Sequence, residues 1–235
     1  MVLSLNKPNR FMEVILIYQN FLSLEEDKQQ TILRACLREF GRYGYQKTSI
    51  DQVAKASGIS KSMVFYYFGT KVGLYSYLLD YSIKILKEYF KNTDELVSGL
   101  DYIEKYQRVV KVKLEAYFKH HEVFEFVTML FLNPENTTIN PTISEMYEEL
   151  MDFRQAAFMS LQESEAENLF KDEINPDQAR KYINWIMEGF SQSIIARIGH
   201  TALIDADIDD AWEEFDEILD DLRRLFYKEN KGGTV

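Results

Sequence analysis

The sequence has little of what interrupts helices or crosslinks a chain. Its 235 residues include one cysteine, 4 prolines and 10 glycines. A single cysteine excludes an intrachain disulfide framework and fits a reducing compartment, so we expect a cytoplasmic protein. Few prolines and glycines favour long helices. No uncharged apolar run of about 18 residues occurs, which argues against a transmembrane helix.

The sequence patterns typical of enzymes and metal sites are also missing. Of the 3 histidines, His120 and His121 are adjacent, so they point to different faces of a helix and do not form an i, i+4 metal pair. We find no H-E-x-x-H motif, no glycine-rich phosphate loop and no G-x-S-x-G motif. We therefore expect a protein that is not an enzyme, with no catalytic residues, no metal and no cofactor.

Acidic residues outnumber basic ones, giving a net charge of −11, which argues against nucleic-acid binding at first sight. The charge is unevenly distributed, however. Residues 25–75 carry 8 Lys and Arg against 5 Asp and Glu, whereas residues 76–235 carry 17 against 32. The positive net charge therefore falls on one segment near the N-terminus, and the acidic remainder would be repelled by DNA.

The segment with positive charge shows the signals of three helices. Apolar residues at helical spacing predict a helix from about residue 25 to 43. Ser49 and Gln52 form a capping box at the start of a second helix, and Ser60 is a good N-cap for a third that ends near Phe68. Two short helices joined by a tight turn, here at Gly58, are typical of a helix-turn-helix motif, although other helical hairpins share the pattern.

The rest of the sequence has the spacing of long amphipathic helices and no sustained alternation typical of strands. After a fourth helix that follows Lys71, we expect helices around 97–119, 121–132, 142–165, 176–199 and 208–228. The fold class predicted is all-α. We expect an N-terminal extension (1–24), a helix-turn-helix domain (25–71), a helical body (72–228) and a disordered tail (229–235).

Residues 45–71 read YQKTSIDQVAKASGISKSMVFYYFGTK. This stretch closely resembles the head of the tetracycline-repressor (TetR) family, whose pattern is roughly G-[YF]-x-x-[TA]-[ST]-[VI]-x-x-[IV]-A-x-x-[AS]-G-[VI]-[SA]-x-[GS]-x-[LVI]-[YF]-x-[YH]-F-x-x-K. The resemblance implies a dimeric regulator with a three-helix DNA-binding head and a helical body that binds a ligand. It also implies that two body helices pair with their symmetry mates in a four-helix bundle.

The resemblance makes the helix from Ser60 to Phe68 the recognition helix, whose first turn would enter the major groove. There, Lys61 would contact a guanine edge or a phosphate, and Met63 a thymine methyl group. Phe65 stands where the family commonly has tyrosine, and it cannot donate a hydrogen bond to a phosphate. The candidate DNA-binding residues are Thr48, Ser49, Ser60, Lys61, Ser62, Met63, Tyr66, Tyr67 and Lys71. For Lys61 the alternative is a solvated side chain, and for Met63, Tyr66 and Tyr67 it is packing.

The body is rich in aromatic residues and methionine at helical spacing, which fits an apolar cavity but also an ordinary core. The candidate ligand-binding residues are Tyr106, Tyr117, Phe124, Met129, Met151, Trp185 and Gln192. The last two helices carry broad apolar stripes, which favour contact with a second copy. The candidate dimer residues are Ile183, Phe190, Ile194, Phe215, Leu219, Leu222 and Phe226.

The sequence therefore predicts a regulator, most simply a repressor, that binds a palindromic operator as a homodimer and is released by a small, mostly apolar molecule. Its expected partners are double-stranded DNA, a second copy and that effector, with no membrane. Two alternatives stay open. One is a dimeric protein-interaction module that has lost DNA binding, and the other is a repressor or activator without a small-molecule ligand.

Overall fold

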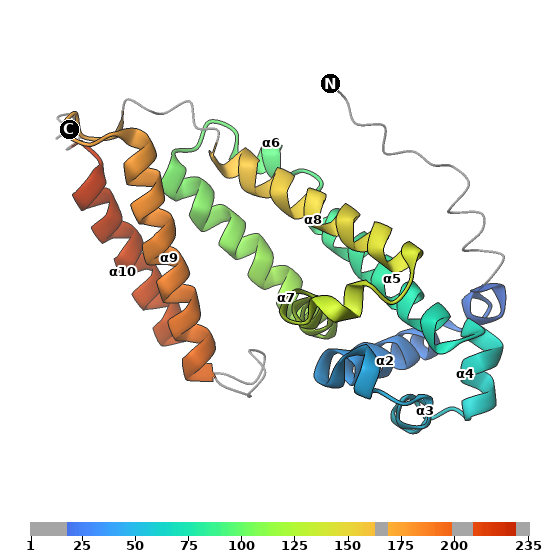
Figure 1. Cartoon of the computed structure of the whole chain (residues 1–235). Coiled ribbons are helices and arrows are strands. Elements are labelled where there is room, and N and C mark those ends of the chain that lie inside the picture. The colour runs from blue at the N-terminus through green and yellow to red at the C-terminus, as the bar shows by residue number, and fades with distance from the viewer. Residues whose placement is uncertain (1–17, 163–168, 199–208, 229–235) are drawn as a thin grey trace. The chain divides into compact units, whose positions relative to one another are not determined.

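The computed structural model of the chain describes residues 18–162, 169–198 and 209–228 (Figure 1). Within these ranges the regular elements are helices, so the predicted all-α class is confirmed. None of the described helices is long and apolar enough to cross a membrane. The helices are α2 (Glu26–Lys47), α3 (Ile50–Ser57), α4 (Lys61–Phe68), α5 (Lys71–Phe90), α6 (Thr93–Val97), α7 (Tyr102–Leu132), the 3-10 helix η1 (Pro134–Thr137), α8 (Pro141–Gln162), α9 (Pro176–Ile198) and α10 (Asp209–Phe226).

Contacts between residues group the described chain into two compact units. Unit 1 contains the residues up to 87 together with 120–151, and unit 2 contains 88–119 together with the residues from 152 onward. Most of α5 and the second half of α7 thus belong with the helix-turn-helix segment, and the expected domain boundary at 71/72 stays a prediction. The sequence predicted separate helices on either side of residue 120. The structure joins them in α7, with a kink at His120, whose backbone is non-helical (φ −138°, ψ 43°).

Unit 1 has an aromatic core around Tyr75 of α5. Its ring lies 5.2 Å from that of Phe40 on α2, 5.1 Å from that of Tyr45 and 5.2 Å from that of Phe126 on α7. Close packing of α2 on α7 is possible because Gly41 has no side chain, since a Cβ atom there would lie 3.1 Å from the backbone nitrogen of Phe126. The second half of α7 is therefore packed directly against the first helix of the head.

The end of α2 bends at Gly44, whose backbone is left-handed in φ (φ 71°, ψ 173°), as glycine permits. The hydroxyl of Thr48 donates to the carbonyl oxygens of Gly44 and Glu39 at 2.8 and 3.1 Å. The backbone nitrogen of Tyr45 donates to Oδ1 of the buried Asn136 on η1 at 3.0 Å. These bonds fix the chain as it enters the helix-turn-helix.

Residues 18–22, in the expected extension, are helical and pack on the head. Phe21 is fully buried, and its ring centroid lies 5.9, 4.8 and 5.4 Å from those of Tyr67, Phe68 and Tyr77. The hydroxyl of Tyr18 donates to the carbonyl oxygen of Gly73 at 3.0 Å. This segment therefore braces both α4 and α5.

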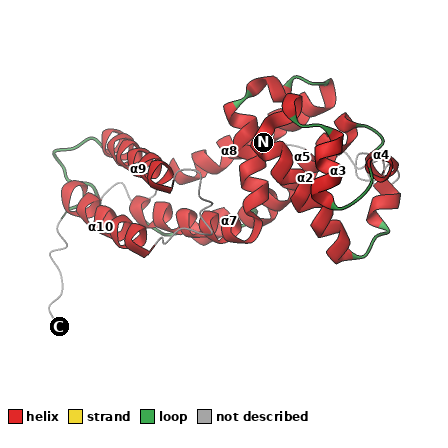
Figure 2. Ribbon diagram, turned by 90° about the horizontal axis from the view of Figure 1, so that it is seen from below, coloured by secondary structure: helices red, strands yellow, loops and turns green. Residues whose placement is uncertain are grey.

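Unit 2 contains α9 and α10, which lie side by side (Figures 1 and 2). One apolar face of each helix packs with the first turn of α7 in a common core. That core consists of Tyr102, Ile103, Phe170, Ala179, Ile183, Met187, Phe215, Leu219, Leu222 and Phe226. Each of the two long helices thus buries one stripe within its own subunit.

Candidate nucleic-acid interface and ligand pocket

The second helix of the motif, α3, begins with the predicted capping box. The Ser49 side chain accepts from the backbone nitrogen of Gln52 at 3.2 Å, and the Gln52 side chain accepts from the backbone nitrogen of Ser49 at 2.7 Å. The helix ends at Gly58, which is left-handed (φ 68°, ψ 22°). This arrangement gives the tight turn that a helix-turn-helix requires.

Helix α4, which the family resemblance makes the recognition helix, begins as predicted at Ser60, whose side chain accepts from the backbone nitrogen of Met63 at 3.2 Å. Val64, Tyr67 and Phe68 are buried, which defines the inner face of the helix. The opposite face is exposed, and we call it the outer face of α4. It consists of Lys61, Ser62, Phe65 and Tyr66.

Lys61, at the start of the outer face, is paired with a residue of α3. Its Nζ lies 2.8 Å from Oδ2 of Asp51, and both side chains are more than half exposed. An exposed ion pair contributes little to stability, about 0–1 kcal/mol. Lys61 can therefore exchange Asp51 for an acceptor on DNA at little loss, while Asp51 holds it at the surface of the motif.

Lys71, the first residue of α5, lies over an aromatic ring. Its Nζ is 4.3 Å from the ring centroid of Tyr45, an arrangement that stabilises a cation. Partial burial lowers its pKa, because the charged form loses solvation. Lys71 thus lies against Tyr45 at the start of α5, a place consistent with the phosphate contact implied by the family resemblance.

Some of the predicted DNA-binding residues do not reach the surface. Thr48 is 1% exposed and uses its hydroxyl within the α2 bend, and Tyr67 is 3% exposed and packs on Phe21. Both therefore have structural roles here instead of facing a ligand. Met63 is half-buried, whereas Ser49, Ser60, Lys61, Ser62 and Tyr66 are exposed. The sequence did not predict that Phe65 is exposed, that Asp51 pairs with Lys61, or that residues 18–22 pack on α4 and α5. Each of these features depends on contacts that form only on folding.

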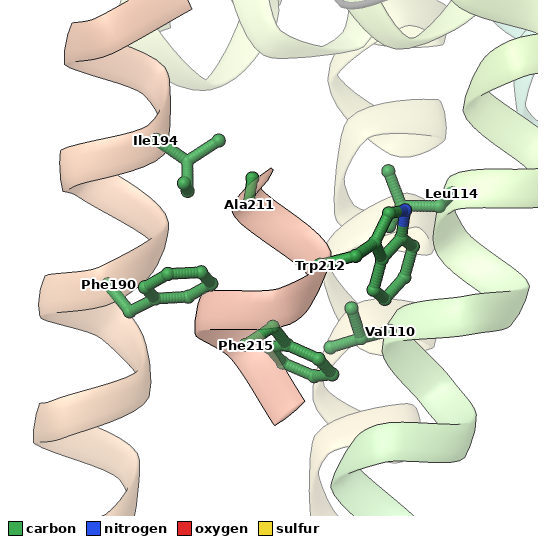
Figure 3. Close-up of a pocket in the computed structure, with 7 residues that line it drawn as sticks. All are labelled: Val110, Leu114, Phe190, Ile194, Ala211, Trp212 and Phe215. Carbon is green, nitrogen blue, oxygen red and sulfur yellow. The ribbon is translucent and has the colours of Figure 1, made fainter. Parts of the chain in front are cut away.

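Unit 2 has a small apolar pocket with a cavity volume of about 70 Å³ (Figure 3). Side chains of α7, α9 and α10 surround it, and the indole of Trp212 lies beside Leu114 (Figure 3). The lining residues are Val110, Leu114, Phe190, Ile194, Ala211, Trp212 and Phe215. Such a lining suits an apolar group without hydrogen-bonding requirements.

None of the seven predicted ligand-binding residues lines this pocket. Phe124, Met129 and Met151 belong to unit 1, while the others belong to unit 2. Tyr106 and Tyr117 are half-buried on the first half of α7, and Trp185 is 61% exposed on α9. The side chain of Gln192 lies outside the described residues. The sequence pattern identified aromatic helices but not which of their faces meet.

The predicted dimer residues lie in the interior of unit 2, and none of them is exposed on its surface. Ile183, Phe215, Leu219, Leu222 and Phe226 belong to the core of unit 2, and Phe190 and Ile194 line the pocket. Different apolar residues of the same two helices face outward. Tyr182, Trp185 and Ile186 of α9 and Leu225 of α10 are each more than 40% exposed.

The helix-turn-helix segment matches a known family. Residues 32–78 match the model described as bacterial regulatory proteins, tetR family. The HTH-type transcriptional regulator RutR of Escherichia coli (strain K12) is 33% identical over 89 residues, which are 38% of this chain and 41% of RutR. The uncharacterized HTH-type regulator YerO of Bacillus subtilis (strain 168) is 25% identical over 113 residues, or 48% of this chain and 39% of YerO. The matched region thus spans about two fifths of each relative.

Solved structures resemble a larger part of the chain. A TetR family transcriptional regulator from Chloroflexus aurantiacus J-10-FL has a TM-score of 0.61 at 18% identity, covering 90% of this chain and 98% of that one. KstR2 of Mycobacterium tuberculosis, a ketosteroid transcriptional regulator, has a TM-score of 0.59 at 16% identity, covering 88% and 98%. At these identities the likeness shows the fold.

The chain thus combines a capped helix-turn-helix with an all-helical body. The N-terminal segment, residues 32–78, matches the tetR family of bacterial regulatory proteins, and the body shares the fold of solved structures of such regulators. The relatives named above are regulators, not enzymes.

Proposed function

We propose that this protein binds a palindromic DNA operator as a homodimer, and that a small apolar molecule in the body releases it. The observation that carries DNA binding is the outer face of α4. It is exposed and begins with Lys61, which a surface ion pair with Asp51 holds. A helix with such a face enters the major groove, where Lys61 and Tyr66 offer hydrogen-bond donors to base edges or phosphates.

The outward stripe of α9 supports the homodimer. Tyr182, Trp185 and Ile186 are exposed at i, i+3 and i+4, and a Cβ atom added to Gly189 at i+7 would meet nothing within 4 Å. The opposite stripe of α9 is buried in unit 2. Helix α9 therefore has two apolar faces, and the core of its own subunit covers one of them. A second copy related by a twofold axis would cover the exposed face.

The pocket of unit 2 supports an apolar effector. It lies between α7, α9 and α10, and α7 continues past His120 into the half that packs on α2. A cavity of about 70 Å³ is far smaller than the roughly 300–1,000 Å³ of typical ligand sites, so an effector must widen it. An effector that favours the widened state would shift the population toward a head spacing that no longer fits two half-sites about 34–36 Å apart.

The test of DNA binding begins by selecting bound sequences from random DNA with the wild-type protein. Fluorescence anisotropy then measures affinity for the selected sequence. Lys61→Ala with Tyr66→Ala should weaken binding at least tenfold, because each contact is worth about 1–3 kcal/mol. Lys111→Ala removes the same charge from an exposed position of α7 in unit 2 and should leave affinity unchanged.

A palindromic selected sequence and loss of affinity only in the α4 variant would support the proposal. Enrichment of no sequence by wild type would overturn it and favour the alternative of a protein-interaction module. Equal affinity of the α4 variant and wild type would also overturn the assignment of α4.

A further inference from the structure

The outer face of α4 contains an apolar side chain at its centre. Phe65 is 40% exposed, and Tyr66 beside it is 59% exposed. Phe65 lies one helical turn after Lys61, at i+4, so the two residues share that face. The inner face of the helix is filled by other residues, and Phe65 therefore does not serve the core of the head.

The chemistry of Phe65 restricts what it can do at a DNA surface. A phenyl ring has no hydrogen-bond donor for a phosphate and none for a base edge. The apolar group that DNA presents in the major groove is the 5-methyl of thymine, and phenylalanine is among the side chains that contact it. The family resemblance suggested Met63 for this contact, but Met63 is half-buried whereas Phe65 is exposed.

We propose that Phe65 is a specificity-determining residue that contacts the methyl group of one thymine in each half-site. This inference rests on the proposed function, because it requires α4 to enter the major groove. Four helical residues rise about 6 Å, and stacked bases are about 3.4 Å apart. The thymine recognised by Phe65 should therefore lie about two base pairs from the base or phosphate that Lys61 contacts.

The test exchanges thymine for uracil, which removes only the methyl group. Each thymine of the selected operator is replaced by deoxyuridine in turn, symmetrically in both half-sites, and affinity is measured by fluorescence anisotropy. At one position, replacing thymine by uracil in both half-sites should weaken wild-type binding about fifteenfold. Each lost methyl contact weakens binding about fourfold, and two such contacts are lost. Phe65→Ala should bind the thymine operator more weakly than wild type does, and it should bind the thymine and deoxyuridine operators equally.

Two further variants act as controls for this measurement. Phe65→Leu keeps an apolar side chain and should retain part of the preference for thymine. Tyr66→Phe removes a hydroxyl that Tyr66 offers to DNA, so it should lower affinity for the thymine and the uracil operator alike and leave the preference for thymine unchanged. Thermal melting of each variant is compared with wild type, which separates a change in DNA binding from a loss of folding.

The outcomes separate this inference from the proposed function. If wild type selects an operator but no thymine position responds, or if Phe65→Ala responds as wild type does, the role of Phe65 is refuted while DNA binding stands. If wild type selects no operator, the proposed function fails and the role of Phe65 fails with it. A thymine preference lost in Phe65→Ala and kept in Tyr66→Phe establishes the inference.

Discussion

The rings of Phe21 and Phe68 lie with their centroids 4.8 Å apart, so a residue ahead of α2 packs on the last residue of the recognition helix. The Phe21 side chain is fully buried and also contacts Tyr67 and Tyr77. The position of α4 on the head therefore depends on a segment that precedes the three-helix motif.

We expect Phe21→Ala to lower the free energy of unfolding by about 3–5 kcal/mol, because it removes a buried ring and leaves a cavity under α4. Urea denaturation followed by circular dichroism measures the change. Leu22→Ala alters the adjacent residue, which is 38% exposed, and should cost less than about 1 kcal/mol. Similar losses in the two variants would contradict the bracing role of Phe21.

The outward stripe of α9 gives a prediction about assembly. Trp185→Glu should convert a dimer into a monomer, because it places a charge at the centre of an apolar contact. Sedimentation velocity measures the mass, and Trp185→Phe should remain dimeric because it keeps an apolar ring. A wild-type monomer, or a Trp185→Glu dimer of unchanged affinity, would argue against this interface.

The helices of the head were predictable from sequence because their signals are local. Ser49 with Gln52, Ser60 and Gly58 specify ends and a turn within a few residues, and the structure has them in the predicted places. The kink at His120 also falls where the pattern predicted a break. The short helix α6 was missed, since five residues provide too little periodicity.

The functional faces were less predictable, because they depend on which side of a helix its neighbours cover. Tyr66 and Tyr67 are identical and adjacent in sequence, yet one is exposed and the other is buried by Phe21, a contact across 46 positions. Likewise, α9 has apolar residues on two sides, and periodicity could not tell which stripe is internal. Such assignments require long-range contacts, which a single sequence does not display.

The pocket of unit 2 can be tested with the tryptophans of the chain, of which there are 2. In Trp185→Phe the remaining indole is Trp212, which lines the pocket. Titration with 1-octanol as an apolar probe should shift its emission and saturate. Ala211→Leu in that background fills the cavity and should abolish the saturable change. The reciprocal variant Trp212→Phe reports from Trp185, which does not line the pocket, and should not respond; equal responses would refute binding at the pocket.

Tyr75 gives a prediction about stability. Among the described residues its buried hydroxyl has no hydrogen-bond partner, and burial raises the pKa of the group. A buried polar atom without a partner is destabilising, so Tyr75→Phe should raise the free energy of unfolding by about 1 kcal/mol. Urea denaturation measures it, with Tyr45→Phe at a half-buried neighbouring position as the control. A loss of stability in Tyr75→Phe would indicate a partner for the hydroxyl.

Tyr77 predicts how stability changes at alkaline pH. Burial, followed by the charges of Asp80, Tyr81 and Tyr18, raises its pKa from 10.0 to about 12. Because the folded-state pKa is the higher one, the unfolded state releases this proton first as the pH rises. The stability contributed by neutral Tyr77 is therefore complete below about pH 10 and is lost as the pH approaches 12.

Tyr77→Phe removes the ionisable group while keeping the ring. Between pH 9 and pH 11, wild type should lose about 1 kcal/mol more unfolding free energy than this variant does, a difference measured by urea denaturation at each pH. Tyr66→Phe removes a phenol that is 59% exposed and should follow wild type across the same range. If Tyr77→Phe declines as steeply as wild type, Tyr77 ionises in the folded protein as it does in water, and its ring is not buried beneath residues 18–22.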